Sequence, residues 1–204
     1  QWRQPLTHLS YIVMNIEDAF KHKSLDEKYM VKKVDEANSQ IDFMSQTIED
    51  FRDFYAPIKR KENFSIAEET EHILEIMKHI LEEKDIEVRL LVKEDSVLKN
   101  YKNGYKQVML NLLTNAKDAL IENHVLKPCI EIMIEKEEVR VYDNAGGVEA
   151  DKLQKIFEPY FTSKEKSLGI GLYMSKMIVE KSMEATLSVE NTKKGACFKM
   201  VFKV

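Results

Sequence analysis

The sequence predicts an α+β protein in which an N-terminal antiparallel helical hairpin precedes an α/β sandwich with a mixed sheet. Apolar residues recur every three or four positions in the first quarter of the 204-residue chain, which is typical of amphipathic helices. Strand-like and helical segments follow one another in the remainder, which favours helices packed on one face of a sheet. We therefore expect a hairpin over residues 1–57, a linker over 58–63 and a second domain over 64–204.

The first domain is expected to hold two helices, over residues 4–22 and 26–56, and Pro57 ends the second one. The apolar positions of the second helix follow the repeat of about 3.5 residues of a coiled-coil seam: Met30, Val34, Ala37, Ile41, Met44, Ile48, Phe51 and Tyr55. A single hairpin leaves this stripe in water, so we expect a homodimer whose two hairpins form a four-helix bundle. The alternative is a hairpin that packs on its own globular domain.

The second domain is expected to begin with a helix that Ser65 caps, because Glu68 completes the pattern of a capping box. This helix reaches about Glu83. The later segments are predicted, in order, as a strand over 86–92, a helix over 103–122, strands over 130–134 and 139–142, helices over 150–157 and 170–181, and strands over 186–190 and 197–204.

The helix over 103–122 carries a polar stripe beside its apolar side. Asn111, Asn115 and Asp118 are spaced i, i+4 and i+7, so their side chains share one side of the helix. Asparagine is a mediocre helix former, and two of them beside a packed surface indicate a pocket with neutral oxygen ligands. Mg²⁺, which keeps waters and borrows phosphate oxygens, suits such a pocket. The alternative is an ordinary solvated amphipathic helix.

Two glycine-containing turns follow in a fixed order. The strand over 139–142 runs into Asp143, and Gly146 and Gly147 then allow a sharp turn and the approach of a flat ring. Asp143 is suited to accept a hydrogen bond from an exocyclic amine such as that of adenine. Gly169 and Gly171 open a helical pattern, where free N–H groups favour a phosphate. Each turn alone is more simply a tight turn; the ordered set indicates a nucleotide site.

These ordered segments resemble the ATP-binding catalytic domain of two-component sensor histidine kinases, in the superfamily shared with gyrase and MutL-type ATPases. Residues 107–119 resemble the Asn-containing box of that family, and residues 143–148 resemble its first glycine box. Residues 157–162 resemble its Phe-containing box, residues 169–172 its second glycine box, and residues 195–198 the turn before its closing strand. The resemblance spans essentially the whole chain and implies ATP and Mg²⁺ as cofactors.

The resemblance also implies roles for individual residues. Asn115 is implied as the Mg²⁺ ligand, Asn111 as a support for the phosphates, and Asp143 as the acceptor for the adenine amine. Lys164 is implied to act in catalysis with the two asparagines. The residues further implied to surround the nucleotide are Asp118, Ala119, Gly147, Val148, Ile156, Phe161, Lys164, Leu168, Gly169, Gly171 and Leu172.

Three departures from the family pattern stand out. Ala145 occupies a place usually given to glycine. Ser167 and Leu168 replace the more usual Gly-Thr, so a hydroxyl that could touch a phosphate is missing at Leu168. Only residues 162–168 are available as a lid over the nucleotide, which makes the lid short.

The first residues resemble the segment that follows the phosphoacceptor histidine of the same kinases, where a Pro-Leu pair lies at a fixed distance. Matching Pro5 and Leu6 to that pair places the acceptor one residue before Gln1, outside this chain. His8 lies on the wrong side of Pro5 and is expected to be an ordinary exposed histidine. The other four, His22, His72, His79 and His124, have no metal-like spacing and are expected at the surface.

Composition limits the remaining possibilities. A net charge of −4 argues against nucleic acid as a partner. Cys129 and Cys197 need not pair, and so few thiols suit a reducing compartment. No apolar run approaches membrane-spanning length and no signal peptide is visible. We expect a cytoplasmic location for this part of the protein, with an upstream sensor or an inner-membrane anchor left open.

The function implied by the resemblance is that of the catalytic core of a two-component sensor histidine kinase. Such a core binds Mg-ATP and transfers the γ-phosphoryl group to a bundle histidine, from which it passes to an aspartate on the receiver domain of a response regulator. Two alternatives remain. One is a dimeric pseudokinase that binds nucleotide as a signalling scaffold, and the other is a gyrase-like ATPase that transfers nothing.

Overall fold

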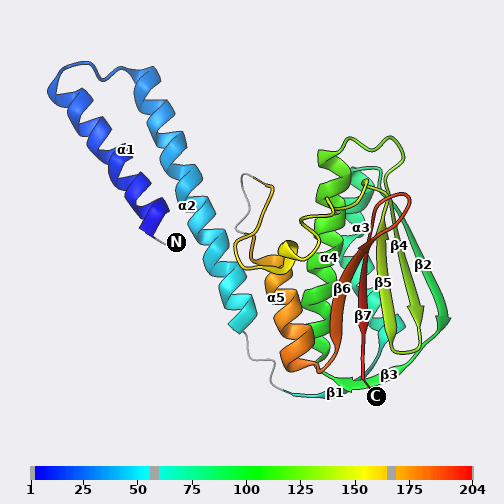
Figure 1. Ribbon diagram of the computed structural model, residues 1–204. Helices are drawn as coiled ribbons and strands as arrows, with labels where there is room; N and C mark the ends of the chain where they lie inside the picture. Colours follow the sequence, from blue (N-terminus) through cyan, green and yellow to red (C-terminus); the bar gives the residue numbers. More distant parts are fainter. Residues whose placement is uncertain (1–2, 56–59, 165–168, 204) are drawn as a thin grey trace. The chain divides into compact units, whose positions relative to one another are not determined.

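The computed structural model describes residues 3–55, 60–164 and 169–203. The chain divides into two compact units, Gln1–Pro57 and Ile58–Val204 (Figure 1). The boundary lies close to the predicted start of the linker.

The first unit is a helical hairpin of α1 (Arg3–Lys21) and α2 (Glu27–Tyr55). Lys23, with φ +55°, lies in the turn, and the Asp26 carboxylate accepts a hydrogen bond of 2.7 Å from the Tyr29 N–H, which caps α2. The predicted hairpin is therefore confirmed. Ile12 is buried between the helices at 1% exposure. Large apolar side chains remain exposed on both helices: Leu6, Tyr11, Val13, Met14, Phe20, Met30, Val31, Val34 and Ile41.

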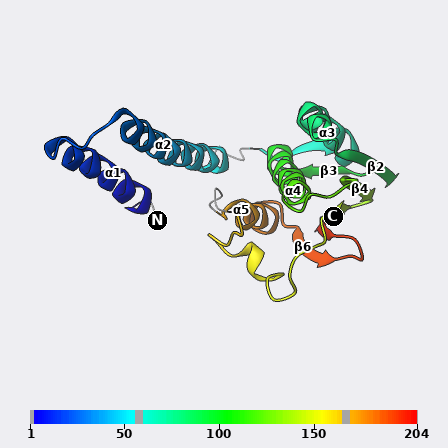
Figure 2. The ribbon, with the colours of Figure 1, turned by 90° about the horizontal axis from the view of Figure 1, so that it is seen from above.

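The second unit is built on a five-stranded sheet in the order β2-β4-β5-β7-β6. Its strands are β2 (Glu87–Glu94), β4 (Cys129–Glu135), β5 (Glu138–Asp143), β6 (Thr186–Asn191) and β7 (Ala196–Val201). β2 pairs with β4 in parallel and the other pairs are antiparallel, so the predicted mixed sheet is confirmed. The helices α3 (Ile66–Glu83), α4 (Lys102–Glu122) and α5 (Gly171–Met177) lie along one face of it (Figures 1 and 2).

The core of this unit lies between α4 and the sheet. Alternate residues of β4 and β5 face the helices and are buried, as a sheet with one covered face requires. The buried side of α4 comprises Tyr105, Val108, Met109, Leu112, Leu113, Ala116 and Leu120. Burial of each large aliphatic side chain stabilises the fold by roughly 1.5–3 kcal/mol. The helix is thus fixed by packing, and its polar stripe is held at the border of the core.

A second, small sheet pairs β1 (Glu62–Ser65) with β3 (Val97–Asn100) in antiparallel fashion. Neither strand was predicted, and β1 begins inside the residues assigned to the linker. Strands of four residues are too short to show a period, and their partners lie far apart in sequence. The predicted cap is present, since Ser65 Oγ accepts from the Glu68 N–H at 3.0 Å. Asp95, before β3, contributes to the same cap, because its Oδ1 accepts a hydrogen bond from the Ala67 N–H at 2.9 Å.

The predicted helix over 150–157 is wrong. Turns occupy residues 150–154, and only a 3₁₀ helix, η1 (Lys155–Phe157), follows. Pro159 favours an extended residue before it, and Glu158 has ψ 143°, so no further helical turn forms. The predicted helix over 170–181 is closer: α5 continues as a π-helix, η2 (Ile178–Ser182).

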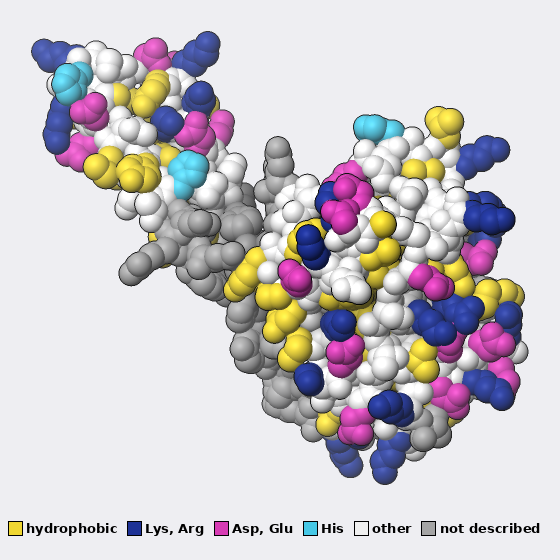
Figure 3. All heavy atoms as spheres, viewed as in Figure 1, with side chains coloured by type: hydrophobic (Ala, Val, Ile, Leu, Met, Phe, Trp, Pro, Cys, Tyr) yellow, Lys and Arg dark blue, Asp and Glu magenta, His cyan; other side chains and the backbone are white. Residues whose placement is uncertain are grey.

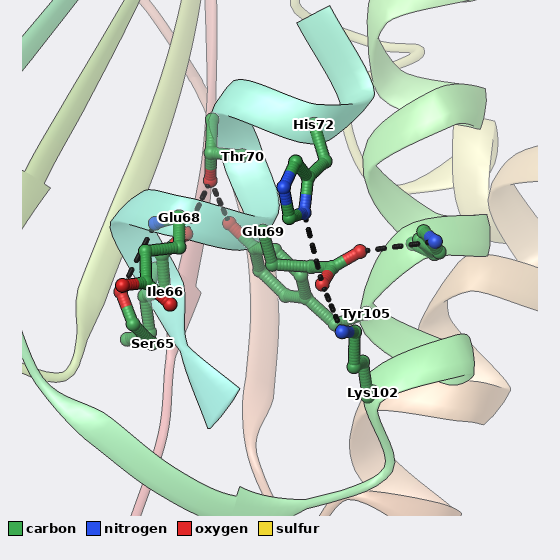
Figure 4. A network of polar contacts seen from close by, with 9 residues as sticks. Ser65, Ile66, Glu68, Glu69, Thr70, His72, Lys102 and Tyr105 are labelled. Carbon is green, nitrogen blue, oxygen red and sulfur yellow. Dashed lines mark hydrogen bonds and ion pairs between the residues drawn. The ribbon is translucent and has the colours of Figure 1, made fainter. Parts of the chain in front are cut away.

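A buried carboxylate fixes the start of α4 against α3 (Figure 4). Glu69 is 2% exposed, and its carboxylate lies 2.8 Å from Lys102 Nζ and 3.2 Å from Lys106 Nζ. Burial acts to raise the pKa of Glu69, but the bonds from Lys102 and Lys106 outweigh it and the pKa lies below its ordinary value. The negative charge also compensates two lysines at a helix N-terminus, where cations are unfavourable. Beside it, the Thr70 and Tyr105 hydroxyls are hydrogen-bonded at 2.6 Å.

Candidate functional site

The polar stripe predicted on α4 exists and lies at the edge of the core. Asn111, Asn115 and Asp118 are half-buried, whereas Leu112 and Ala116 on the adjoining side of the helix are buried. The first of the three contacts α5. Asn111 Nδ2 donates to Ser175 Oγ at 2.8 Å, and a Cβ at Gly171 would lie 2.5 Å from Asn111 Oδ1. The absence of a side chain at Gly171 is therefore what allows the Asn111 amide to reach the start of α5.

Asn115 carries a polar atom that the described residues leave unsatisfied. Its Nδ2 is buried and has no hydrogen-bond partner there. The unpaired Nδ2 is a donor, which suits a phosphate oxygen or a water, whereas the Oδ1 of the same amide is the atom that could coordinate a cation. Leaving a buried polar group unpaired costs about 1–3 kcal/mol, and such groups are typical of functional sites. The amide is thus available to a ligand.

The residues around Asn115 fit Mg²⁺ bound together with a phosphate ligand. Within the described parts of the chain, no group of three or more His, Cys, Asp or Glu side chains is placed to hold a metal ion alone. One amide oxygen suits a cation that keeps several waters and takes the rest of its ligands from phosphates. It does not suit a metal held entirely by protein side chains.

Asp118 lies between two lysines. Its Oδ2 is 2.7 Å from Lys164 Nζ, and its Oδ1 is 2.8 Å from Lys117 Nζ. Burial acts to raise the pKa of Asp118, but hydrogen bonds from the two lysines outweigh burial and hold the pKa below its ordinary value. Lys164 is 46 residues further along the chain, so this ion pair ties the segment after the Phe-containing box to α4.

Asp143 ends β5 as a nearly buried carboxylate, 8% exposed. Its Oδ1 accepts hydrogen bonds from the Ala145 N–H at 2.9 Å and the Ala196 N–H at 3.2 Å. Burial raises the pKa of Asp143, and the two N–H groups oppose this only in part. Its Oδ2 has no partner among the described residues. One oxygen is therefore fixed by the protein, and the other is free to accept from a ligand amine.

Two glycines turn the backbone after Asp143. Gly146 has φ +92° and Gly147 has φ +87°, in the left-handed region that favours glycine. Ala145, which departs from the family pattern, has no such angle and is 7% exposed, so a methyl group is accommodated without backbone strain. At Gly147 a Cβ would lie 2.6 Å from Asn191 Oδ1. A side chain at Gly147 would thus displace Asn191.

Asparagine side chains from other elements hold this loop. The Asn191 amide accepts from the Val148 N–H at 2.8 Å and donates to the Val148 carbonyl at 2.6 Å. Asn123 Nδ2, just after α4, donates to the Ala145 carbonyl at 2.8 Å. The bond from Asn123 joins the loop to the end of α4, the helix that carries the polar stripe. It therefore connects the two halves of the predicted site.

The second glycine turn closes on the Phe-containing box. Gly169 has φ +63°, and a Cβ there would lie 2.3 Å from the Phe161 carbonyl oxygen. The Tyr160 N–H donates to the Gly169 carbonyl at 2.9 Å. Tyr160 and Gly169, which lie on either side of the predicted lid over residues 162–168, are therefore hydrogen-bonded to each other. Leu168, which was predicted to border the nucleotide, lies outside the described residues.

The other predicted residues are distributed around the same helices. Ala119 is half-buried on α4, and Leu172 is half-buried on α5. Ile156 is 9% exposed in η1, which contacts α5. The structure thus brings Asn111 to Gly171, Asp118 to Lys164, Phe161 to Gly169, and Val148 to Asn191.

Sequence reasoning missed Asn123, Ser175 and Asn191. Each bonds to a residue far along the chain, and none falls inside one of the recognised boxes. The signal that was available is weak: Asn191 ends a strand, and Asn123 follows the last turn of a helix, where asparagine is also common for local reasons.

Comparison with known proteins identifies the second unit. Residues 100–204 match the family model of histidine kinase-, DNA gyrase B- and HSP90-like ATPases. The chain belongs to this ATPase family. The match covers all of the boxes recognised in the sequence, from the polar stripe of α4 to β7, and the family implies that the chain binds ATP.

Curated relatives of this chain include sensor kinases. The chain is 29% identical to the two-component sensor PprA of Pseudomonas aeruginosa over 96% of its length, but spans 22% of that protein. It is 28% identical to sporulation kinase D of Bacillus subtilis over 87% of its length and spans 35% of it. The resemblance to sensor histidine kinases is thereby confirmed, for a chain that is less than half as long as these relatives.

Solved structures share the fold of both units. The histidine kinase AdeS of Acinetobacter baumannii aligns with a TM-score of 0.64 at 18% identity, covering 99% of this chain and 96% of that one. The histidine kinase ThkA, in complex with the response regulator protein TrrA, aligns with a TM-score of 0.64 at 21% identity, covering 99% of this chain and 58% of that one. At these identities the likeness establishes the fold alone.

The described part of the N-terminal unit begins after the first residues of the predicted phosphoacceptor segment. Gln1 lies outside the described residues, and the side chain of Pro5 is also not described. His8 is exposed, as predicted. His72 is exposed as well, although it lies beside the buried Glu69. Over the described residues, no helix combines the length and the apolar character that a membrane span requires.

Proposed function

We propose that this chain is the catalytic core of a sensor histidine kinase that binds Mg-ATP between α4, α5 and the loop after β5. The observation that carries the proposal is the pair of available polar groups in a family of ATPases. Asp143 offers one free carboxylate oxygen, and Asn115 offers a buried Nδ2 that has no partner among the described residues. The first suits an adenine amine, and the second suits an oxygen of a phosphate or of a water in a Mg-phosphate complex.

Each residue would have a distinct task. Asp143 would accept the hydrogen bond of the exocyclic amine, while Gly146 and Gly147 keep the backbone free of side chains where the base lies. Asn115 would hold Mg²⁺, which neutralises phosphate charge when bound. Asn111 would steady the phosphates from its place beside Gly171, where the absence of a side chain leaves room for them.

The chemistry proposed is transfer of the γ-phosphoryl group to an imidazole nitrogen of a histidine on the helical hairpin. The bond between the γ-phosphorus and the bridging β,γ-oxygen breaks, a nitrogen–phosphorus bond forms, ADP leaves and the imidazole loses its N–H proton. The contribution of this chain is mainly positioning and charge neutralisation. Lys164 would be the cation that approaches the phosphates.

We further propose that the chain acts as a homodimer and passes the phosphoryl group to an aspartate of a response-regulator receiver domain. Exposed apolar side chains on α1 and α2 support the dimer, because a second hairpin would remove them from water. The relation of ThkA to TrrA supports a receiver domain as partner. The register of Pro5 and Leu6 remains the basis for placing the phosphoacceptor directly before Gln1.

Calorimetric titration with MgADP, MgATP and MgGTP tests the nucleotide assignment. Asn115→Ala should weaken the Mg-nucleotide more than the metal-free nucleotide, and Asp143→Asn should weaken adenine nucleotides more than guanine nucleotides. Unchanged binding by both variants would refute the site. Phosphotransfer is tested with a chain that carries histidine ahead of Gln1, which should form an acid-labile, base-stable phosphoprotein. Labelling of His8 in the chain as given would refute the register.

A further inference from the structure

The ion pair between Asp118 and Lys164 joins α4 to the segment after the Phe-containing box, which are two parts of the proposed nucleotide site. Lys164 Nζ lies 2.7 Å from Asp118 Oδ2, and the two side chains are 23% and 31% exposed. The backbone of Lys164 is also held, because its N–H donates to Thr162 Oγ1 at 3.0 Å. The backbone of Lys164 is therefore held in place, whereas its long side chain can rotate toward a different anionic partner.

Asp118 has a second cation that does not depend on this segment. Lys117 Nζ lies 2.8 Å from Oδ1, the oxygen that Lys164 does not contact. Lys117 is on α4 itself, next to Asp118. If Lys164 leaves, the carboxylate keeps one positive partner and does not become an unpaired charge at the edge of the core. Separating Lys164 from Asp118 should therefore cost less free energy than breaking an isolated ion pair.

The alternative partner for Lys164 would be close. Asp118 follows Asn115 by one helical turn on the same stripe, a spacing at which Cβ atoms are about 5–6 Å apart. A phosphate held near Asn115 would therefore lie within the sweep of the flexible four-carbon stem of lysine. Charges of both signs are interspersed over the face of this unit seen in Figure 3.

We propose that Asp118 sets the preference of the site for a nucleoside triphosphate over a diphosphate by competing with the terminal phosphate for Lys164. This inference rests on the proposed nucleotide site. A triphosphate offers Lys164 a strong anionic partner and draws it from Asp118. A diphosphate lacks the terminal group, so Lys164 stays on Asp118. The carboxylate is thus an internal competitor that lowers triphosphate affinity and ties the segment after Phe161 to the phosphate state of the nucleotide.

A double-mutant cycle tests the competition. The dissociation constants of MgADP and of a non-hydrolysable MgATP analogue are measured by calorimetry for the wild type, Asp118→Asn, Lys164→Met and the double variant. Asp118→Asn should tighten the triphosphate relative to the diphosphate by about fivefold, the factor that corresponds to a partly exposed ion pair. Lys164→Met should weaken the triphosphate selectively. In the Lys164→Met background, Asp118→Asn should leave the ratio of the two constants unchanged.

A matched control is Asp85→Asn, which removes an exposed carboxylate before β2 and should leave the ratio as in the wild type. An Asp118→Asn variant with the wild-type ratio would overturn the inference, as would an increase that persists without Lys164, because the effect would then be general electrostatics. A wild-type chain that binds neither nucleotide would overturn the proposed function itself. Thermal unfolding of each variant confirms that the folded state is being compared.

Discussion

The side chain of Asn191 forms hydrogen bonds with both backbone polar groups of Val148, accepting from the N–H at 2.8 Å and donating to the carbonyl at 2.6 Å. These two bonds are of the kind that a neighbouring strand would form, and they hold the loop after β5 in place. Because Gly147 leaves no room for a Cβ beside the same amide, the end of β6 and the glycine turn form one structural element.

Replacement of Asn191 should loosen this loop. Asn191→Ala removes two hydrogen bonds and should lower the free energy of unfolding by about 1–2 kcal/mol, measured by urea denaturation. Adenine nucleotide affinity should fall with it. Asn191→Asp keeps the acceptor but faces the Val148 carbonyl with a second negative atom, so it should not rescue binding. The exposed Asn63→Ala in β1 serves as the control; an equal loss in both variants would contradict the role given to Asn191.

Two glycine substitutions should differ in cost. At Gly195 a Cβ would lie 2.2 Å from the Asp143 carbonyl oxygen and 2.5 Å from its Oδ1, so Gly195→Ala should displace Asp143. We expect a loss of about 3 kcal/mol, as for overpacking, and loss of adenine preference. Gly146→Ala meets no atom within 4 Å and should cost only about 1 kcal/mol for its φ of +92°. Chemical denaturation of both variants distinguishes these outcomes, and equal costs would refute the steric argument.

The buried Glu69 should make stability depend on pH. Its pKa is lowered in the folded state, so its contribution is present above the unfolded pKa and is lost as pH falls through the folded value. Relative to the wild type, Glu69→Gln should lose about 1–2 kcal/mol at pH 7, a value reduced because both lysines are partly exposed. The difference should shrink below about pH 4. The exposed Glu71→Gln on α3 should show no such difference.

The exposed apolar side chains of the hairpin should hold a dimer. Val34 and Ile41, which are 41% and 49% exposed in one chain, belong to the predicted seam of α2. Val34→Asp combined with Ile41→Asp should give monomers in sedimentation at micromolar concentration, while nucleotide binding persists because the second unit has its own core. A wild-type chain that sediments as a monomer would contradict the bundle.

Ionisation of the buried Asp143 carboxyl should lower the stability of the folded state as pH rises. Its folded pKa is raised by burial, so this residue's contribution to stability falls as pH rises from the unfolded pKa through the folded one. Asp143→Asn should therefore be at least as stable as the wild type at pH 7, measured by thermal unfolding, even though its adenine preference is lost. A strong destabilisation would indicate that the carboxylate is needed for the fold and not for a ligand.

Local pattern was sufficient for the long elements and for the order of the boxes. The repeat of α2, the stripe of α4 and the cap at Ser65 each depend on residues that are close together in sequence. Pairs formed by distant residues were not predictable in this way: β1 with β3, Asn191 with Val148, and Lys164 with Asp118. The helix expected over 150–157 failed because Pro159 restricts Glu158 and leaves only a 3₁₀ turn.

The order of the sheet has a consequence for synthesis on the ribosome. Among the strands of the described residues, β6 is hydrogen-bonded only to β7, and β7 lies between β5 and β6 although it is the last of them to be made. Until β7 emerges, β6 has no partner and β5 presents an unpaired edge, so nascent chains carry open strand edges that attract other chains. The hairpin of α1 and α2, made first and joined by local contacts, can already be folded while the nucleotide-binding unit is still waiting for its internal strand.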